Sequence, residues 1–197
     1  MVSLTLDYVR SRLFLEDHSS PAPAGLLPAG VLAPVFLAGG DVSLLFTQRT
    51  MNLKAHQGQI SFPGGVKDPE DPDLLATALR ETEEEIGLKP AEVEILGTLN
   101  PVATTTGYWI KPFVAVIPYP YGFRLNRQEV NRLLIFPLKA FCVPERWSSG
   151  PYHHKGQTVQ VRCWKYQGTV IWGATACMIL DLLSRLGEHP LSQQCID

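Results

Sequence analysis

The chain of 197 residues is long enough to bury a hydrophobic core of ordinary domain size. Hydrophobic residues make up 45% and charged residues 18%, a composition that excludes an intrinsically disordered chain. The formal net charge of −2 gives no electrostatic footprint for nucleic acid, so we expect no nucleic-acid partner.

The cysteines and the first residues indicate the compartment. The 4 cysteines lie far apart and form no Cys-x-x-Cys pair, which argues against a structural zinc site. Residues 1–16 contain too many charges for the core of a signal peptide. No apolar run approaches the roughly 18 residues that suggest a membrane span. We therefore expect a cytoplasmic protein without a membrane partner.

The first part of the chain predicts a helix and a β-hairpin. Residues 3–16 have apolar side chains at helical spacing, and residues 17–29 are rich in Pro, Ala and Gly, as in a surface connector. Two apolar segments, residues 30–38 and 42–49, predict strands joined by a Gly-Gly-Asp turn. We expect one domain over residues 1–197, in which residues 1–29 form the helix and connector and residues 30–187 the core.

A Gly-Gly turn and an acidic helix follow. Residues 59–62 predict a strand, after which Gly64 and Gly65 allow the backbone to approach a ligand or metal closely. Asp71 suits the N-cap of the helix, since its carboxylate can accept from the free amides of the first turn. With Pro72 at the first helical position and Gly87 after the end, the helix is predicted over residues 72–86.

The predicted helix has an apolar stripe and an acidic face. The stripe consists of Leu75, Leu79, Thr82 and Ile86. Glu81, Glu84 and Glu85 fall on the other side, where like charges repel unless a cation binds. Hard oxygen ligands at this spacing suit Mg²⁺ or Mn²⁺, and the adjacent Arg80 can orient one carboxylate. A solvated acidic helix face would give the same pattern.

The rest of the chain predicts three more strands, a hairpin and a last helix. The strands are expected at residues 92–99, 108–117 and from 129 on, with a short helix near 138–142; residues 148–156 are expected to be a loop, residues 159–166 and 169–171 a hairpin, and residues 173–187 a helix. We expect the polar loop at residues 104–107 to line a site, unless it is a plain turn. The aromatic rings of residues 118–123 either stack on an adenine or, as we favour, pack on the protein.

The helix and the glycine turn resemble the signature of the Nudix hydrolases, a Gly, then an acid, then Arg-Glu-x-x-Glu-Glu-x-Gly. The matching residues are Gly65, Asp71, Arg80, Glu81, Glu84, Glu85 and Gly87. The first acid is Asp rather than Glu, and the gap to Arg80 is one residue longer than in the general pattern. Both departures resemble the coenzyme A pyrophosphatase-like Nudix proteins. Further positions that resemble this subfamily are Arg49, Leu53, Lys54, His56, Gly58, Gln59, Phe62, Pro63, Trp172, Gly173, Thr175 and Ala176.

The resemblance implies a fold and an activity. The fold would be the Nudix α/β/α sandwich with a mixed sheet. The activity would be metal-dependent hydrolysis of a pyrophosphate bond, with coenzyme A (CoA) or acyl-CoA giving 3′,5′-ADP and 4′-phosphopantetheine. Two alternatives stay open: another nucleotide substrate, such as a dinucleotide, a nucleotide sugar or a nucleoside triphosphate, or a non-catalytic nucleotide-binding module. The intact Glu81, Glu84 and Glu85 argue against the module. The protein would be a monomer or a homodimer.

The resemblance also assigns roles to residues. Glu81 and Glu85 would be the principal ligands of Mg²⁺ or Mn²⁺, and the Gly65 carbonyl would complete the shell. Glu84 would be a third ligand or the base, and Arg80 would orient the carboxylates. The other expected site residues are Glu129 facing the metal, Arg49 as a phosphate clamp, and His56, Gln59 and Gly64 at the substrate.

Overall fold

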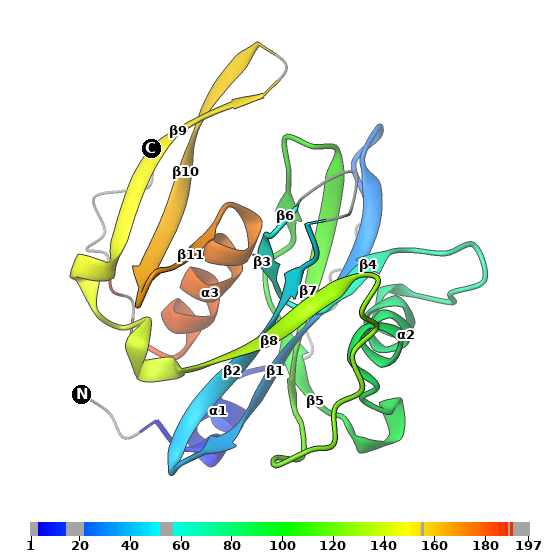
Figure 1. Cartoon of the computed structure of the whole chain (residues 1–197), viewed down its shortest axis with the longest axis vertical. Coiled ribbons are helices and arrows are strands. Elements are labelled where there is room, and N and C mark those ends of the chain that lie inside the picture. The colour runs from blue at the N-terminus through cyan, green and yellow to red at the C-terminus, as the bar shows by residue number, and fades with distance from the viewer. Residues whose placement is uncertain (1–3, 15–21, 52–56, 155, 189, 191–197) are drawn as a thin grey trace.

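The computed structural model describes residues 4–14, 22–51, 57–154, 156–188 and 190 (Figure 1). His56, together with Leu53 and Lys54, lies outside the described residues, so its predicted contact with substrate is not tested. The α-helices are α1 (Leu6–Arg12), α2 (Leu74–Ile86) and α3 (Ala174–Arg185), and three 3₁₀ turns are η1 (Pro90–Glu92), η2 (Leu138–Ala140) and η3 (Pro144–Arg146). No helix in these ranges is long and apolar enough to cross a membrane.

The main sheet is mixed. Its central order is β3-β2-β1-β7-β5, and β4 pairs with β1, β6 with β7 and β8 with β2. The strands are β1 (Leu27–Ala38), β2 (Asp41–Arg49), β3 (Ile60–Ser61), β4 (Gly64–Val66), β5 (Glu94–Thr98), β6 (Val102–Ala103), β7 (Tyr108–Val116) and β8 (Val130–Pro137). Strands β1 and β7 are parallel, with Val31 opposite Pro112, while the other pairs are antiparallel. A smaller antiparallel sheet has the order β11-β10-β9.

Both faces of the main sheet are covered, which explains the unbroken apolar sequence of β1 and β2. On β1, Leu32 and Phe36 pack in one cluster with Ile86 of α2. The alternate residue Val35 packs in a second cluster with Ile179 of α3. Figure 1 shows α2 on one side of the sheet and α3 on the other. The α/β fold with a mixed sheet, predicted from the Nudix resemblance, is confirmed.

The predicted start of α2 was wrong by two residues. The N-cap is Asp73, whose carboxylate accepts from the amide of Ala76 at 2.8 Å, and Leu74 is the first helical residue. Asp71 does not cap the helix because its carboxylate accepts from the side chains of Arg80 and Thr77 instead. The predicted end was right, since Gly87 closes the helix in the left-handed conformation at φ 72°.

The smaller sheet contains a strand that the sequence did not predict. Residues 148–156 were expected to be a loop, but β9 (Trp147–His154) pairs along its length with β10 (Gln157–Tyr166). Its Ser-Ser-Gly-Pro start has no apolar alternation, so pairing with β10 rather than local preference makes it a strand. The predicted hairpin of β10 and β11 (Thr169–Trp172) is confirmed.

Candidate active site

Glycines let α2 pack directly on the sheet beneath it. Gly30 of β1 lies opposite Gly65 of β4, and a Cβ at Gly30 would overlap the carbonyl oxygen of Leu74 in the first turn of α2. A Cβ at Gly65 would lie 2.7 Å from Oε1 of Glu81. The Glu81 carboxylate therefore rests against the backbone of β4, which the Gly-Gly turn was expected to allow.

Glu85 lies on the buried face of α2, not on the opposite acidic face where the sequence placed it. Only 4% of Glu85 is exposed, and it shares this face with Ala78 and Thr82. Leu79 of the predicted apolar stripe is only partly buried. The face of α2 that packs on the sheet lies closer to Glu85 than predicted. The reason is that Gly30 has no Cβ, so the side of α2 that carries Ala78 can approach β1 closely.

Burial leaves the Glu85 carboxylate poorly compensated. The pKa of Glu85 is raised to about 8, chiefly by desolvation; the charges of Glu81 and Glu129 act in the same direction, while Arg49 and the backbone amide of Gly64 oppose the shift. Oxygen Oε2 of Glu85 is buried without a hydrogen-bond partner in the described part of the chain. A bound cation would stabilise the ionised form of such a carboxylate.

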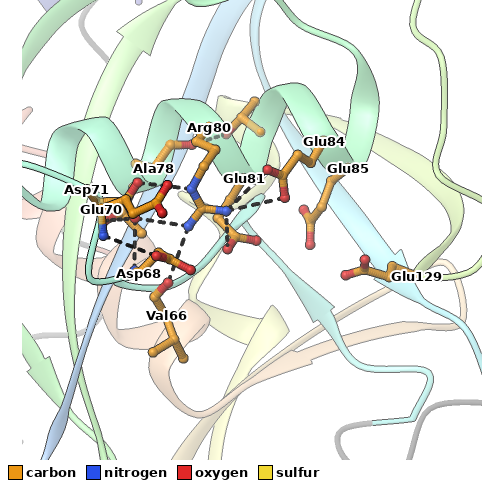
Figure 2. Close-up of polar contacts among 12 residues, drawn as sticks. Val66, Asp68, Glu70, Asp71, Ala78, Arg80, Glu81, Glu84, Glu85 and Glu129 are labelled. Carbon is orange, nitrogen blue, oxygen red and sulfur yellow. Dashed lines mark hydrogen bonds and ion pairs between the residues drawn. The ribbon is translucent and has the colours of Figure 1, made fainter.

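Arg80 joins three acidic side chains beside Glu85 (Figure 2). Its Nε and Nη2 donate to the two oxygens of Asp71, each at 3.0 Å. Its Nη1 lies 2.9 Å from Glu81 Oε1 and 3.2 Å from Glu84 Oε2. The guanidinium lowers the pKa of Asp71 well below its usual range through these hydrogen bonds. Asp71 thus anchors Arg80, and Arg80 orients two of the predicted metal ligands.

The carboxylates of Glu81 and Glu84 therefore do not converge with that of Glu85 on one metal position. Within the described ranges, no group of three acidic, histidine or cysteine side chains is arranged as a ready-made metal site. Glu84 is largely exposed, and Glu81 is half-buried, with its pKa raised by desolvation. The geometry places the Arg80 guanidinium where the two carboxylates would otherwise turn toward a cation.

Glu129 reaches the same space from a distant part of the chain. Figure 2 shows Glu85 and Glu129 pointing toward one another. Asn126 contacts both Glu85 and Glu129. Its backbone amide donates to the backbone carbonyl of Glu85 at 2.9 Å, and its side-chain Nδ2 donates to Glu129 Oε1 at 3.1 Å. Sequence reasoning missed Asn126. Its Oδ1 accepts from the backbone amide of Gln128, two residues further on, and asparagine favours an Asx turn of this kind.

Arg49 faces Glu85 from β2. Its Nη1 lies 4.0 Å from Glu85 Oε1, and its Nε is buried without a hydrogen-bond partner among the described residues. A register shift between Gln48 and Arg49 interrupts the pairing of β2 with β8 at this point. The backbone amide of Arg49 donates to the carbonyl of Gln59 at 2.9 Å, which brings both predicted substrate contacts together.

A cavity of about 670 Å³ opens over these groups. Its lining includes the predicted site residues Arg49, Gln59, Gly64, Gly65, Glu81, Glu85 and Glu129. Arg80 and Glu84 lie beside it rather than in its wall. The loop at Thr104–Thr106 lines the cavity, as expected. The tyrosines of residues 118–123 pack on the protein, as favoured: Tyr119 stacks on Phe36 with ring centroids 4.5 Å apart.

The far wall of the cavity was missed by sequence reasoning. It is formed by β9, β10, the end of β11 and the start of α3, with Tyr152, Val161, Arg162 and Trp172 among the lining residues. This wall was missed because strand β9 was not predicted. Without β9, the hairpin of β10 and β11 has no third strand to extend its face. Trp172 and Gly173 were noticed in the sequence, but only for their resemblance to the subfamily.

Comparisons with known proteins bear on the family and the fold. The family model described as "NUDIX domain" matches residues 26–142. The chain is 35% identical over 189 residues to "Uncharacterized Nudix hydrolase NudL" of Escherichia coli O139:H28, covering 95% of this chain and 98% of the relative. NudL of Shigella flexneri matches with the same identity and coverage. A solved C. elegans Ap4A hydrolase in a binary complex has a TM-score of 0.50 and 21% identity, covers 56% of this chain and 80% of its own, and shares the fold.

Proposed function

The chain belongs to the Nudix hydrolase family, and from that premise we propose that it hydrolyses the pyrophosphate bond of coenzyme A or an acyl-CoA. The products would be 3′,5′-ADP and 4′-phosphopantetheine. The single observation that supports catalysis at this site is the buried Oε2 of Glu85, which has no hydrogen-bond partner among the described residues and lies beside Glu81 and Glu129.

The donor set fits a divalent cation. Desolvation, together with repulsion from Glu81 and Glu129, raises the pKa of Glu85, and a bound Mg²⁺ or Mn²⁺ ion, which prefers oxygen ligands, would stabilise the three carboxylates. We assign Glu81 and Glu85 as the principal ligands, with the Gly65 carbonyl completing the shell and Glu84 as either a third ligand or the base. Arg80 can remain anchored to Asp71 through Nε and Nη2 while its Nη1 releases Glu81 and Glu84.

Hydrolysis requires a water to attack a phosphorus atom that negative oxygens shield. A bound divalent cation supplies charge neutralisation and lowers the pKa of water. Arg49 would bind the diphosphate beside Glu85, because its guanidinium is already in the cavity. Either Glu84 or Glu129 would accept the proton of the attacking water as the new P–O bond forms and the bridging P–O bond breaks. Asn126 would hold Glu129 in place for this role.

The choice of CoA rests on the subfamily resemblance around residues 49–65 and 172–176. Several of these residues, among them Arg49, Gln59 and Trp172, line one cavity with the carboxylates. A cavity of about 670 Å³ has room for a nucleotide-sized ligand.

The experiment that tests the proposal is hydrolysis of a panel with Mg²⁺ and with Mn²⁺, with products identified by mass. The panel contains CoA, acetyl-CoA, NADH, ADP-ribose and a nucleoside triphosphate. Release of 3′,5′-ADP from CoA or acetyl-CoA alone supports the proposal. Cleavage of another member in their place would keep the chemistry and change the substrate. No cleavage by the folded protein with either metal would contradict the proposed activity.

A further inference from the structure

The cavity contains a second cationic side chain, which comes from a part of the chain far in sequence from the carboxylates. Among the described residues that line it, the arginines are Arg49 and Arg162. Arg49 faces Glu85, as described above. Arg162 comes from β10 of the smaller sheet, so the two positive charges are supplied by different sheets. The cavity therefore offers a positive group that the diphosphate site does not use.

Neighbouring groups fix the position of Arg162. Its Nη1 donates to Oγ of Ser149 at 2.7 Å, and these two residues lie directly opposite each other in the pairing of β9 with β10. The carbonyl oxygen of Arg162 accepts from the amide of Gly173 at 3.0 Å, which joins β10 to the start of α3. The side chain and the backbone are thus held by separate contacts, and the guanidinium is positioned before any ligand binds.

The charge of Arg162 acts inside the cavity. Cys177, in the first turns of α3, also lines the cavity; desolvation raises its pKa, and the positive charge of Arg162 opposes part of that rise. The lining of the cavity also includes the apolar residues Val159, Val161 and Ala174. A guanidinium beside apolar surface attracts an anion more strongly than one in open water, because less water screens the pair.

We infer that Arg162, positioned by Ser149, forms an anion subsite that binds a phosphate of the substrate other than the scissile diphosphate. The inference rests on the proposed function, in which Arg49 and the carboxylates with their cation take the diphosphate. In CoA, the phosphate outside the diphosphate is the 3′-phosphate of the ribose. Arg162 would then be the residue that distinguishes CoA from the otherwise identical dephospho-CoA.

Binding of two product-like nucleotides tests the subsite without hydrolysis. Calorimetry compares 3′,5′-ADP with 5′-AMP for the wild type, Arg162→Gln, Arg162→Lys and Ser149→Ala. We expect the wild type to bind 3′,5′-ADP about tenfold more tightly, Arg162→Gln to lose that preference, and Arg162→Lys to keep part of it. Lys165→Gln is the matched control, because Lys165 is exposed on the same strand and does not line the cavity. A wild type without the preference, or an Arg162→Gln variant that keeps it, would overturn the inference.

Kinetics separate this inference from the proposed function. The ratio of kcat/KM for CoA to kcat/KM for dephospho-CoA should fall about tenfold in Arg162→Gln, through KM rather than kcat. CoA cleavage with an unchanged ratio would refute the subsite and leave the function standing. A preference for 3′,5′-ADP that depends on Arg162, in a protein that cleaves no CoA, would refute the function and keep the subsite. Thermal unfolding of each variant checks that the hairpin remains folded.

Discussion

Arg49 Nη1 and Glu85 Oε1 face each other at 4.0 Å across the floor of the cavity, and each side chain also has a buried polar atom without a hydrogen-bond partner in the described structure. A buried ion pair normally satisfies its remaining polar atoms, because an unpaired one costs about 1–3 kcal/mol. This pair does not, so the site keeps binding capacity for charged groups from outside the protein.

Removing the charge of Glu85 should abolish most activity. Glu85→Gln keeps the shape of the side chain but removes a ligand charge, so we expect kcat to fall on the order of a hundredfold or more while the fold is retained. Initial rates at saturating Mg²⁺ and circular dichroism measure the two effects. Glu83→Gln is the control, since Glu83 is exposed on the same helix. Wild-type turnover in Glu85→Gln would refute the metal assignment.

The same substitution should change the pH dependence of stability in the metal-free protein. Burial raises the pKa of Glu85 to about 8, from its ordinary value of 4.5. The unfolded chain then releases this proton at lower pH than the folded chain, so the free energy of unfolding falls as pH rises from about 4.5 to about 8. Glu85→Gln lacks this loss and should unfold several degrees higher than the wild type at pH 8 but not at pH 5.

Thermal unfolding in a chelator at a series of pH values measures this difference. Adding Mn²⁺ at pH 8 should raise the midpoint of the wild type and leave that of Glu85→Gln nearly unchanged, because binding stabilises the ionised carboxylate. Parallel pH profiles for the two metal-free proteins would show that Glu85 is not the group that titrates.

A methyl group at Gly65 should disturb Glu81 alone. A Cβ there would lie 2.7 Å from Glu81 Oε1, so Gly65→Ala should displace the carboxylate and lower kcat at least about tenfold. Gly122→Ala is the matched control, because a Cβ at Gly122 would meet nothing within 4 Å. Rates for the two variants, with their unfolding midpoints, distinguish a local displacement from general destabilisation. Equal rates in both variants would contradict the close approach of Glu81 to β4.

Asp71 and Asp73 should respond differently to the same substitution. Asp71→Asn removes the charge that anchors Arg80, and we expect a loss of about 2 kcal/mol in the free energy of unfolding at neutral pH. Asp73→Asn should cost less than about 0.5 kcal/mol, since Asn caps helices as well as Asp does. Urea unfolding measures both. A larger loss in the free energy of unfolding for Asp73→Asn than for Asp71→Asn would support Asp71 as the N-cap instead.

The Asp71 contribution also has a defined pH window. Arg80 lowers the pKa of Asp71 in the folded state, so this stabilisation is present above the unfolded pKa of about 4 and is lost as pH falls below it. The difference between the wild type and Asp71→Asn should therefore shrink in acid.

Arg49 should act mainly in binding. Arg49→Ala removes the guanidinium that faces the diphosphate position, and we expect KM to rise about tenfold or more, with a smaller change in kcat. Lys89→Ala is the control, since Lys89 is exposed and lies outside the cavity lining. Steady-state kinetics measures both variants. Unchanged KM and kcat in Arg49→Ala would rule out the clamp.

The sequence by itself determined the family, most of the elements and the identity of the acidic helix. Apolar runs on β1 and β2, the glycine that ends α2 and the spacing from Arg80 to Glu85 are local patterns, and each reflects a preference that acts within a few residues. The expectation that Gly65, Arg49 and the helix carboxylates belong to one site followed from the resemblance to a known signature.

Only the tertiary structure decided which carboxylate is buried and what lies opposite it. Helical periodicity gives the angle between Glu81, Glu84 and Glu85 but not the side on which the sheet packs, which depends on the bare backbone at Gly30. The contact of Asn126 with Glu129 and with α2, and the wall that β9 completes around Arg162, join residues far apart in the chain. Such contacts depend on strand pairing over long separations, and no local preference encodes them.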